Sequence, residues 1–413
     1  MPLREEALEL HTKYTGKIAV QGKVRVTNAH ELALAYTPGV AEPCKEIAAD
    51  INKVYQYTSR GNMVAVVSNG TSVLGLGDIG PEAALPVMEG KALLFKTFAG
   101  IDAFPVCIKA REVDDVVQTV KNLEPTFGGI NLEDISAPRC FEIERLLKEE
   151  CDIPIFHDDQ HGTAIVCLAA LLNAIKLVGK SLQDLQVVVN GDGAAGTAVS
   201  KLLLSAGVGE LILCDENGAL YPGRERMTPA KEKMAYLTNR QGFKGSLAKA
   251  LQGSDVLIGL SVGKIVTTEM VKDMAREPVI MAMANPEPEI YPEAAFAGGA
   301  RVVCTGRSDF PNQVNNVLAF PGVFRGALDV RARDINEEMK IAAATAIAGL
   351  LDAGELREDY IIPDPFDQRV APAVAAGVAQ AAIESNVARV MVDPREVARR
   401  TRKIINKEDG GQG

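Results

Sequence analysis

The segment VVVNGDGAAGTAV restricts the fold of this chain more than any other feature. An apolar run typical of a buried strand leads directly into Gly191, Gly193 and Gly196, which form the pattern GxGxxG, and a helical pattern follows. In such a strand, turn and helix, the first glycine permits the tight turn, the second lets the backbone approach a pyrophosphate, and the third lets the helix pack on the strand. The segment therefore predicts a dinucleotide site, with the helix amides at Ala194 and Ala195 facing the phosphates.

An acidic residue ends the next apolar run, LILCD. This residue, Asp215, follows the glycines at about the twenty-residue offset at which a carboxylate accepts hydrogen bonds from ribose hydroxyls. Its charge favours NAD over NADP, whose 2′-phosphate it would repel. Lys231 and Lys233 follow and could pair with that phosphate, so NAD and NADP both stay open as cofactors.

Apolar runs and helical patterns alternate regularly from residue 162 onward. This alternation is typical of α/β proteins with a Rossmann-type, doubly wound parallel sheet. We expect three parts. Residues 1–161 form a smaller N-terminal α/β domain for substrate and metal, 162–330 form the NAD(P)-binding domain, and 331–413 form C-terminal helices that pack back on the N-terminal domain.

Two acidic strings, LEDIS and HDDQHGTA, offer candidate metal ligands: Glu133, Asp134 and Asp159. Mg²⁺ and Mn²⁺ prefer oxygen ligands and are commonly held by a few carboxylates. Acids of this kind also often only cap a helix, and taken singly each string fits that interpretation better. The apolar run IPIF before Asp158 and the helical pattern after it favour a ligand site, because α/β proteins bind ligands where a strand turns into a helix.

Composition excludes several classes of function. The 413 residues carry a net charge of −10, which disfavours binding to the phosphate backbone of nucleic acids. The seven scattered cysteines form no CxxC pair, which is typical of reduced thiols. The apolar segment from Thr163 to Gly179 is interrupted by Asn173 and Lys176, and the first residues lack the apolar centre of a signal peptide. We therefore expect a soluble, cytoplasmic protein with no membrane partner.

Redox chemistry at this site also needs a base and an acid, for which Lys91 and Tyr36 are candidates. A lysine acts as a base only if burial or a nearby cation lowers its pKa. Considered alone, Lys91 fits better as a solvated surface lysine, and Tyr36 fits better as a packed tyrosine with an exposed hydroxyl.

Together, these motifs resemble the malic enzyme family in its shorter prokaryotic form. The resemblance runs in one order from Tyr36 to Asp329. It rests on AYTPGVAEPC, VLGLGDIG, LPVMEGKALLF, LEDIS, IFHDDQHGTA, VVVNGDGAAG, ANPEPEIYPE and VNNVLAFPGVFRGALD. It implies oxidative decarboxylation of malate to pyruvate and carbon dioxide, with a divalent metal and NAD or NADP.

The resemblance also implies roles for single residues. Lys91 would be the general base, Asp158 would support it, and Tyr36 would be the general acid. Asn285 and Asn316 would bind the substrate at the edge of the nicotinamide pocket. The metal would be held by Glu133, Asp134 and Asp159.

One position departs from the longer members of the family. In those members an arginine that binds a substrate carboxylate precedes the LGLGD string, whereas Ser72 stands in that place here. How the second carboxylate of the substrate is bound therefore stays open.

Three other functions stay open as well. They are a malolactic enzyme that releases lactate, a hydroxyacid dehydrogenase that stops at the keto acid, and a nucleotide-sensing module without activity. The resemblance further implies a homodimer or higher homo-oligomer in which the first domain helps to shape a neighbour's site.

Overall fold

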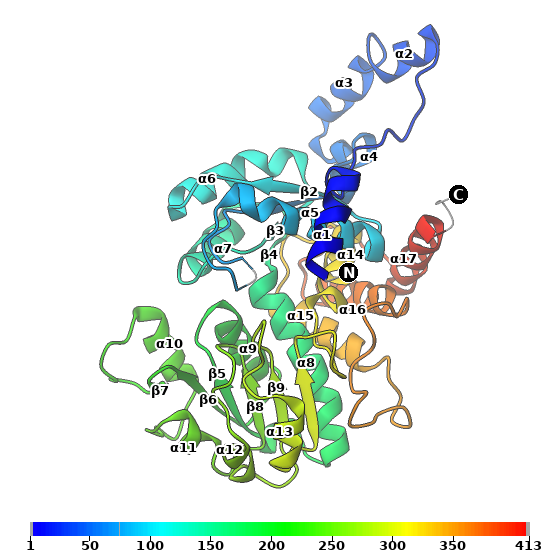
Figure 1. Cartoon of the computed structure of the whole chain (residues 1–413). Coiled ribbons are helices and arrows are strands. Elements are labelled where there is room, and N and C mark those ends of the chain that lie inside the picture. Colours follow the sequence, from blue (N-terminus) through cyan, green and yellow to red (C-terminus); the bar gives the residue numbers. More distant parts are fainter. Residues whose placement is uncertain (1–2, 74, 410–413) are drawn as a thin grey trace.

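The structure is a computed structural model that describes residues 3–73 and 75–409 (Figure 1). It contains two sheets in separate halves of the molecule, with helix α8 (Asp158–Val178) between them (Figure 1). The predicted α/β class, with a Rossmann-type domain, a smaller N-terminal α/β unit and C-terminal helices, is confirmed.

The first sheet is parallel throughout, in the order β2-β1-β3-β4. Its strands and covering helices are β1 (Met63–Ser68), α5 (Pro81–Ala99), β2 (Asp102–Cys107), α6 (Val113–Leu123), β3 (Gly129–Leu132), α7 (Arg139–Glu150) and β4 (Ile155–His157). The short strand β3, GINL, is completely buried. Sequence interpretation did not identify it, because four residues are too few to show a period.

The second sheet has the order β10-β9-β8-β5-β6-β7. Its elements are β5 (Gln186–Asn190), α9 (Ala194–Ser205), β6 (Glu210–Asp215), β7 (Gly218–Ala219), α10 (Pro229–Leu237), α11 (Leu247–Leu251), β8 (Val256–Gly259), α12 (Thr268–Lys272), β9 (Val279–Ala282), α13 (Pro292–Ala297) and β10 (Val302–Thr305). All neighbours are parallel except β7, which pairs antiparallel with β6 at the edge. The chain order reverses beside β5, so a crevice for a ligand opens at the carboxyl end of that strand.

Helix α8 is apolar and long enough to cross a membrane, yet most of it lies buried in the centre of the protein. Its buried Asn173 donates hydrogen bonds to the carbonyl oxygens of Ala348 and Ile361, at 3.0 and 2.9 Å. These bonds tie α8 to the C-terminal part of the chain, so α8 is a core helix.

Four C-terminal helices complete the core: α14 (Phe320–Asp329), α15 (Glu337–Ala348), α16 (Val370–Glu384) and α17 (Pro394–Asp409). Phe320 and Phe324 of α14 stack edge to face on Phe95 of α5, with ring centroids 4.7 and 5.3 Å apart. Helix α15 packs instead on α8 and α9. The C-terminal helices therefore contact both halves of the molecule.

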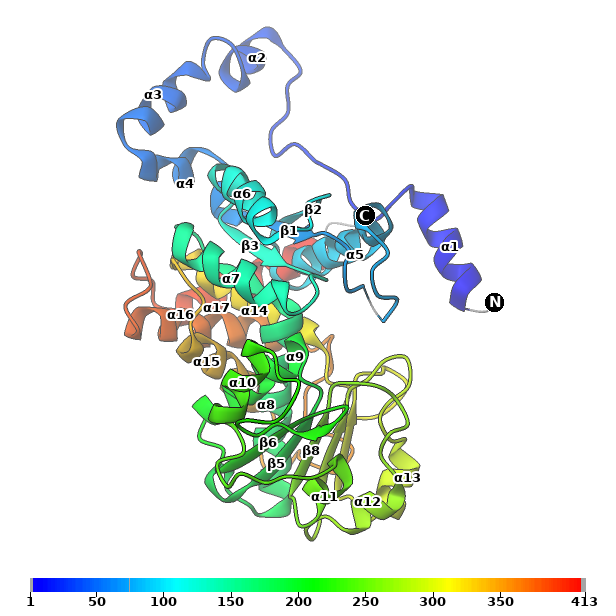
Figure 2. The same ribbon diagram turned by 90° about the vertical axis from the view of Figure 1, so that its left-hand side faces the viewer.

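The N-terminal segment reaches away from the rest of the protein, as Figures 1 and 2 both show for α2 and α3. Its helices are α1 (Leu3–Tyr14), α2 (Ala29–Ala35), α3 (Ala41–Ala49) and α4 (Val54–Tyr57), and none of them buries a residue. Single 3₁₀ turns occur at Ile51–Lys53, Arg60–Asn62, Glu124–Thr126, Leu182–Asp184 and Asn316–Leu318. The N-terminal segment exposes apolar side chains that include Val24, Leu32 and Leu34. We call residues 18–57 the arm.

Candidate active site

The acidic strings lie side by side at the carboxyl edge of the first sheet. Glu133 and Asp134 follow β3 directly, and Asp158 and Asp159 follow the neighbouring β4. Strands β3 and β4 are parallel and pair Leu132 with His157, so both strings leave the sheet at the same level. The strand-to-helix position expected for Asp158 is correct, because α8 begins at that residue.

Lys91 reaches this edge from α5. Its ammonium forms an ion pair with Asp158 Oδ2 and lies 3.1 Å from Glu133 Oε1. It also lies 3.9 Å from the centroid of the Phe320 ring. The Lys91 side chain is only 10% exposed, so the solvated surface lysine favoured for this residue alone is wrong.

Burial and charge perturb the titration of these groups. Burial alone would lower the pKa of Lys91, but the carboxylates of Asp158 and Glu133 outweigh it and raise that pKa above its ordinary value. Burial raises the pKa of Glu133 well above its usual range, and repulsion from Asp159 and the other acids adds to this effect. Several carboxyl groups therefore compete here for one ammonium.

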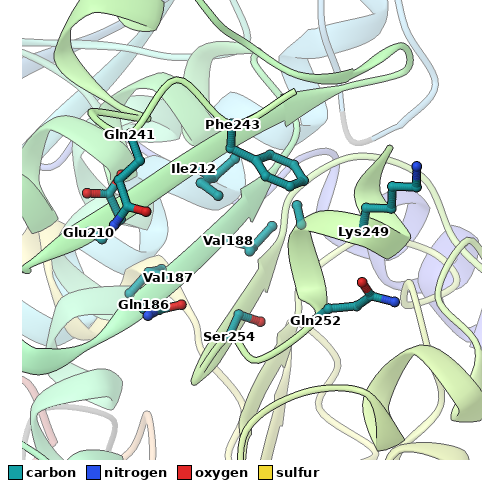
Figure 3. A pocket seen from close by; sticks show the side chains of 11 residues that line it. Gln186, Val187, Val188, Glu210, Ile212, Gln241, Phe243, Lys249, Gln252 and Ser254 are labelled. Carbon is teal, nitrogen blue, oxygen red and sulfur yellow. The ribbon is translucent and has the colours of Figure 1, made fainter. Parts of the chain in front are cut away.

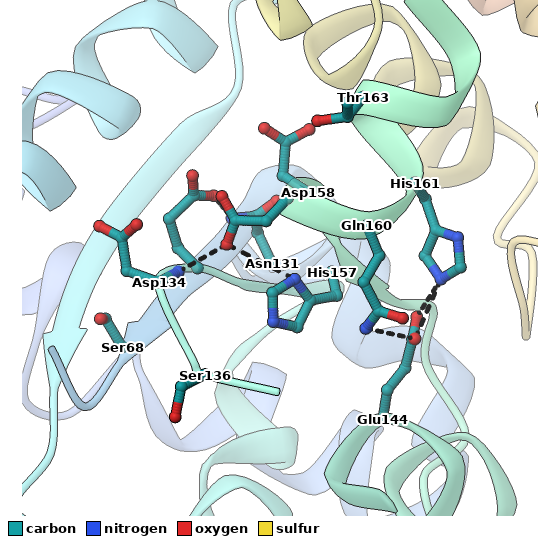
Figure 4. A network of polar contacts seen from close by, with 12 residues as sticks. Ser68, Asn131, Asp134, Ser136, Glu144, His157, Asp158, Gln160, His161 and Thr163 are labelled. Atoms are coloured by element: carbon teal, nitrogen blue, oxygen red, sulfur yellow. Dashed lines mark hydrogen bonds and ion pairs between the residues drawn. The ribbon is translucent and has the colours of Figure 1, made fainter. Parts of the chain in front are cut away.

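The surroundings of this charge cluster suit a cation. Asp158 Oδ1 is buried and accepts no hydrogen bond within residues 3–73 and 75–409. Glu133 Oε2 accepts a hydrogen bond from Asn131 Nδ2 at 2.7 Å. Asp159 Oδ2 accepts the backbone N–H of Asp134 at 2.8 Å (Figure 4). The three expected metal ligands thus lie at one edge and supply oxygen atoms, the donors that Mg²⁺ and Mn²⁺ prefer.

The two asparagines lie differently. Asn316 donates a hydrogen bond from Nδ2 to Asp158 Oδ2 at 3.0 Å and accepts one from Thr163 at 3.3 Å, so it belongs to the Lys91 cluster. Asn285 follows β9 and is exposed. A Cβ atom on Gly75 would lie 3.3 Å from its carbonyl oxygen, so the GLGD loop of the first half approaches the second half here.

Sequence interpretation missed Gly162 and Asn131. A Cβ atom on Gly162 would lie 1.9 Å from Asp158 Oδ1, so only glycine leaves room for that carboxylate. The spacing from Asp158 to Gly162, one helical turn, is a signal that could have indicated this contact. No local pattern marks Asn131, whose side chain bonds Glu133 from inside strand β3.

The glycines of the second sheet lie as their motif requires. Gly191 has a φ of +120°, and a Cβ atom on Gly196 would lie 1.7 Å from the Gly191 carbonyl oxygen. A Cβ atom on Gly193 would meet no described atom within 4 Å, so space remains there for a ligand. Ala194 and Ala195 form the first turn of α9. A cavity of about 250 Å³ opens beside Gly193 and Asp192.

Asp215 lies at the end of β6 with both carboxylate oxygens occupied. Arg224 donates from Nη1 to its Oδ1 at 2.8 Å and pairs with Oδ2, and Lys231 lies 2.7 Å from Oδ2. Burial works against ionisation, yet these two cations lower the pKa of Asp215 to about 2. Lys231 also lies 3.0 Å from Asp192.

A second group of acids resembles a metal site by distance only. Among the residues that the structure describes, Asp192, Asp215 and Glu216 bring one carboxylate oxygen each within 4.8 Å of the others. Arg224 and Lys231 already pair with Asp215, and Lys231 also pairs with Asp192, so two cations offset most of the charge of these three acids.

A small cavity of about 120 Å³ opens at the other edge of the second sheet (Figure 3). It is lined by Gln186 and Glu210, the first residues of β5 and β6. Because ligands of such sheets bind at the carboxyl ends of the strands, this cavity lies on the wrong side for the cofactor.

Tyr36 does not join the cluster around Lys91 within one chain. It caps the C-terminus of α2 in the arm and is 68% exposed. Figures 1 and 2 place α2 far from α5, which carries Lys91.

The seven cysteines are free, five of them buried, as expected for reduced thiols. The fold and the site together define a two-sheet dinucleotide-binding oxidoreductase with a buried lysine and carboxylates next to its nucleotide domain. Comparison with known proteins specifies which oxidoreductase this is.

Two family models match the chain. The model "Malic enzyme, NAD binding domain" matches residues 160–383, and "Malic enzyme, N-terminal domain" matches residues 15–112 and 109–148. The chain is 63% identical to the bifunctional malic/malolactic enzyme of Bacillus subtilis, covering 98% of this chain and 99% of that protein. It is 57% identical to the NAD-dependent malic enzyme of Geobacillus stearothermophilus, covering 91% and 78% of the two chains.

A solved structure matches over the whole fold. The malic enzyme of Pyrococcus horikoshii superposes with a TM-score of 0.96 at 48% identity and covers 99% of this chain and 97% of that one. The chain belongs to the malic enzyme family, in its short prokaryotic form. Its activity is the NAD(P)-dependent oxidative decarboxylation of malate, so the non-enzymatic alternative is wrong.

Proposed function

We propose that malate is oxidised and decarboxylated at the carboxyl edge of the first sheet, with Lys91 as the general base. The observation that carries this proposal is the buried ammonium of Lys91 between Asp158 and Glu133. A base in this position must give up its proton before it can accept one from the 2-hydroxyl of malate. The positioning of Lys91 falls to Asp158, which Asn316 holds by a hydrogen bond.

We assign the metal to Glu133, Asp134 and Asp159. Mg²⁺ or Mn²⁺ bound there would polarise the substrate oxygen and stabilise negative charge that develops on it. A cation bound beside Glu133 would also weaken the attraction that keeps Lys91 protonated, and so would lower the pKa of Lys91 toward the range of a base. Asn285 and Asn316 are assigned to the substrate, and the binding of its second carboxylate stays open at Ser72.

The nicotinamide cofactor is assigned to Gly191, Gly193, Gly196 and the first turn of α9, with Ala194 and Ala195. Asp215 stands where a carboxylate favours NAD by repelling a 2′-phosphate, but Arg224 and Lys231 neutralise most of its charge, so this preference is small. Lys231 works in the opposite sense from the same place, since its ammonium could pair with that phosphate.

Malolactic activity is a second candidate, favoured by the name of the Bacillus subtilis relative. Both reactions use one site and differ in whether the reduced cofactor leaves or returns its hydride to the product. An assay that follows reduced cofactor, pyruvate, lactate and carbon dioxide together separates them. Release of lactate and carbon dioxide without net cofactor reduction would support malolactic activity. Cofactor reduction without release of carbon dioxide would indicate a simple dehydrogenase.

We further propose that the chain acts as a homodimer or higher homo-oligomer in which the arm delivers Tyr36 to a second copy. The arm exposes apolar side chains such as Val24 and Leu34, which a partner surface would bury. Tyr36 would protonate carbon 3 after carbon dioxide leaves.

We also propose that the domains divide after residues 161 and 330; the first of these boundaries falls inside α8. A cytoplasmic location fits the free cysteines.

Mixing two inactive variants tests the delivery of Tyr36 by the arm. Tyr36→Phe and Lys91→Ala chains, co-expressed in equal amounts, form hybrid dimers in which one of the two sites has both intact residues. Random pairing then restores about one quarter of the wild-type activity. Each variant alone is the control, and a mixture as inactive as its components would contradict a shared site.

A further inference from the structure

A second cavity, separate from the nucleotide site, opens where four helices from all parts of the chain meet. It has a volume of about 250 Å³ and is lined from α7, α8, α9 and α15. Helix α7 belongs to the first half of the molecule, α9 to the nucleotide domain and α15 to the C-terminal part. A ligand held here therefore contacts both halves at once.

More cationic than acidic side chains line this cavity. Arg145 pairs with Glu142 and Glu149, and Lys148 pairs with Asp334, all outside the lining. Four cationic side chains border the cavity, against two carboxylates. The cations are Arg145, Lys148, Lys201 and Lys340, and the acids are Glu144 and Glu337.

Lys340 and Lys201 line the cavity in different surroundings, since Lys340 is buried and paired with an acid and Lys201 has no ion-pair partner among the described residues. Lys340 has a side chain only 4% exposed, and its ammonium contacts Glu337 and lies 3.2 Å from His161 Nδ1. Lys201, from α9, forms no ion pair with another residue that the structure describes, and its ammonium lies 6.0 Å from the centroid of the Phe141 ring. Burial lowers the pKa of Lys201, and repulsion from Lys233 adds to it, while Glu144 raises the pKa and Lys340 lowers it again. An anion between Lys201 and Lys340 would offset the repulsion between their ammonium groups.

The cavity adjoins the active site through the first turn of α8. Gln160 and His161 line it and directly follow Asp158 and Asp159. Both hydrogen-bond to Glu144 of α7, from Gln160 Nε2 at 3.1 Å and between His161 Nε2 and the carboxylate at 2.7 Å (Figure 4). A change at Lys340 therefore reaches, through His161, the helical turn that carries the acids of the active site.

We propose that this cavity binds a small anion rich in phosphate or carboxylate oxygens, and that this binding alters the activity of the enzyme through α8. The anion bridges Lys201 and Lys340 and so fixes α9 and α15 against α7. The cavity is distinct from the one beside Gly193, with which it shares Phe141 as a lining residue.

Calorimetry with two probes, inorganic phosphate and tricarballylate, tests the proposal. The full-length enzyme is saturated with NADH, so that the phosphate sites of the cofactor are filled. We expect saturable binding of at least one probe, at one site per chain. Stronger binding of phosphate would indicate a phosphorylated ligand, and stronger binding of tricarballylate a polycarboxylate.

Three variants locate the site. Lys201→Ala should weaken binding by about ten-fold or more, the usual loss when a charged hydrogen-bond donor is removed. Lys201→Arg should restore most of it, and Lys272→Ala, an exposed lysine of α12, should leave it unchanged. In the malate assay, at fixed free Mn²⁺, the probe should change KM or kcat at least two-fold in the wild type and not in Lys201→Ala.

Absence of saturable binding would overturn the proposal. So would equal affinity in Lys201→Ala and the wild type, which would leave an adventitious ion only, or binding with no change in the kinetics. These outcomes are independent of the roles of Lys91 and Tyr36, because neither residue is altered.

Discussion

Replacement of Lys91 by methionine isolates the charge at the centre of the site. Lys91→Met keeps the length of the side chain and its packing on Phe320 but removes the ammonium. The groups that lose it are buried: the side chains of Asp158 and Glu133 are 1% and 9% exposed. Removing one partner of such a buried pair leaves an uncompensated charge, which lowers the free energy of unfolding by about 3–5 kcal/mol.

The fall in the free energy of unfolding caused by Lys91→Met should be larger at high pH than at low pH. Burial raises the pKa of Glu133 on folding. Its contribution to the free energy of unfolding is therefore fully present below its unfolded pKa, where it is protonated. That contribution is lost as pH rises through the folded pKa. Without Lys91, the largest interaction that lowers this pKa is lost, so the loss of stability extends to higher pH. We expect the difference between Lys91→Met and wild type to be smaller at pH 5 than at pH 8, by about 1.4 kcal/mol for each pH unit per proton involved.

Urea unfolding in EDTA at the two pH values measures this difference, with no metal to replace the ammonium. The double variant Lys91→Met/Asp158→Asn is the matched control, because it removes one of the stranded charges and should recover much of the stability. Malate oxidation should be lost in Lys91→Met, while NADH binding persists. A destabilisation below about 1 kcal/mol at pH 8, or one equal at both pH values, would refute the reasoning.

Other substitutions test the metal and cofactor assignments. Asp159→Ala should abolish activity and weaken Mn²⁺ binding about 100-fold or more in a metal titration; an unchanged titration would argue against this ligand. Gly196→Ala should destabilise the nucleotide domain, because its Cβ would lie 1.7 Å from a carbonyl oxygen. Gly193→Ala should have the melting temperature of the wild type yet bind NADH weakly. If both glycine variants lost stability and NADH affinity to the same extent, the separate roles assigned to the two glycines would be wrong. Asp215→Asn should raise the ratio of kcat/KM for NADP to kcat/KM for NAD about ten-fold, because Lys231 becomes free to pair with the 2′-phosphate. A fall in this ratio would contradict the role assigned to Asp215.

Much of the fold followed from local pattern. The run VVVN, the glycines Gly191 to Gly196 and the helix after them predicted β5, the turn and α9 correctly, because propensity and chain geometry act within a few residues. The short strand β3 and the antiparallel β7 escaped, since they are too brief to show a period and depend on their sheet neighbours.

The site divides in the same way. The sequence alone determined that Asp158 and Asp159 stand where a strand turns into a helix, because both elements are encoded by the residues beside them. Only the tertiary structure decided that Lys91 is buried against Asp158, 67 residues away, and that Asn316 bonds the same carboxylate from 158 residues away.

Tertiary structure also decided the charge around Asp215 and the place of Tyr36. Arg224 and Lys231 neutralise an acid that the motif alone presents as free for ribose. Tyr36 lies on an arm that its own chain leaves exposed. Burial and pairing of charges depend on which strand edges and helices meet in space, and residue spacing along the chain does not encode that meeting.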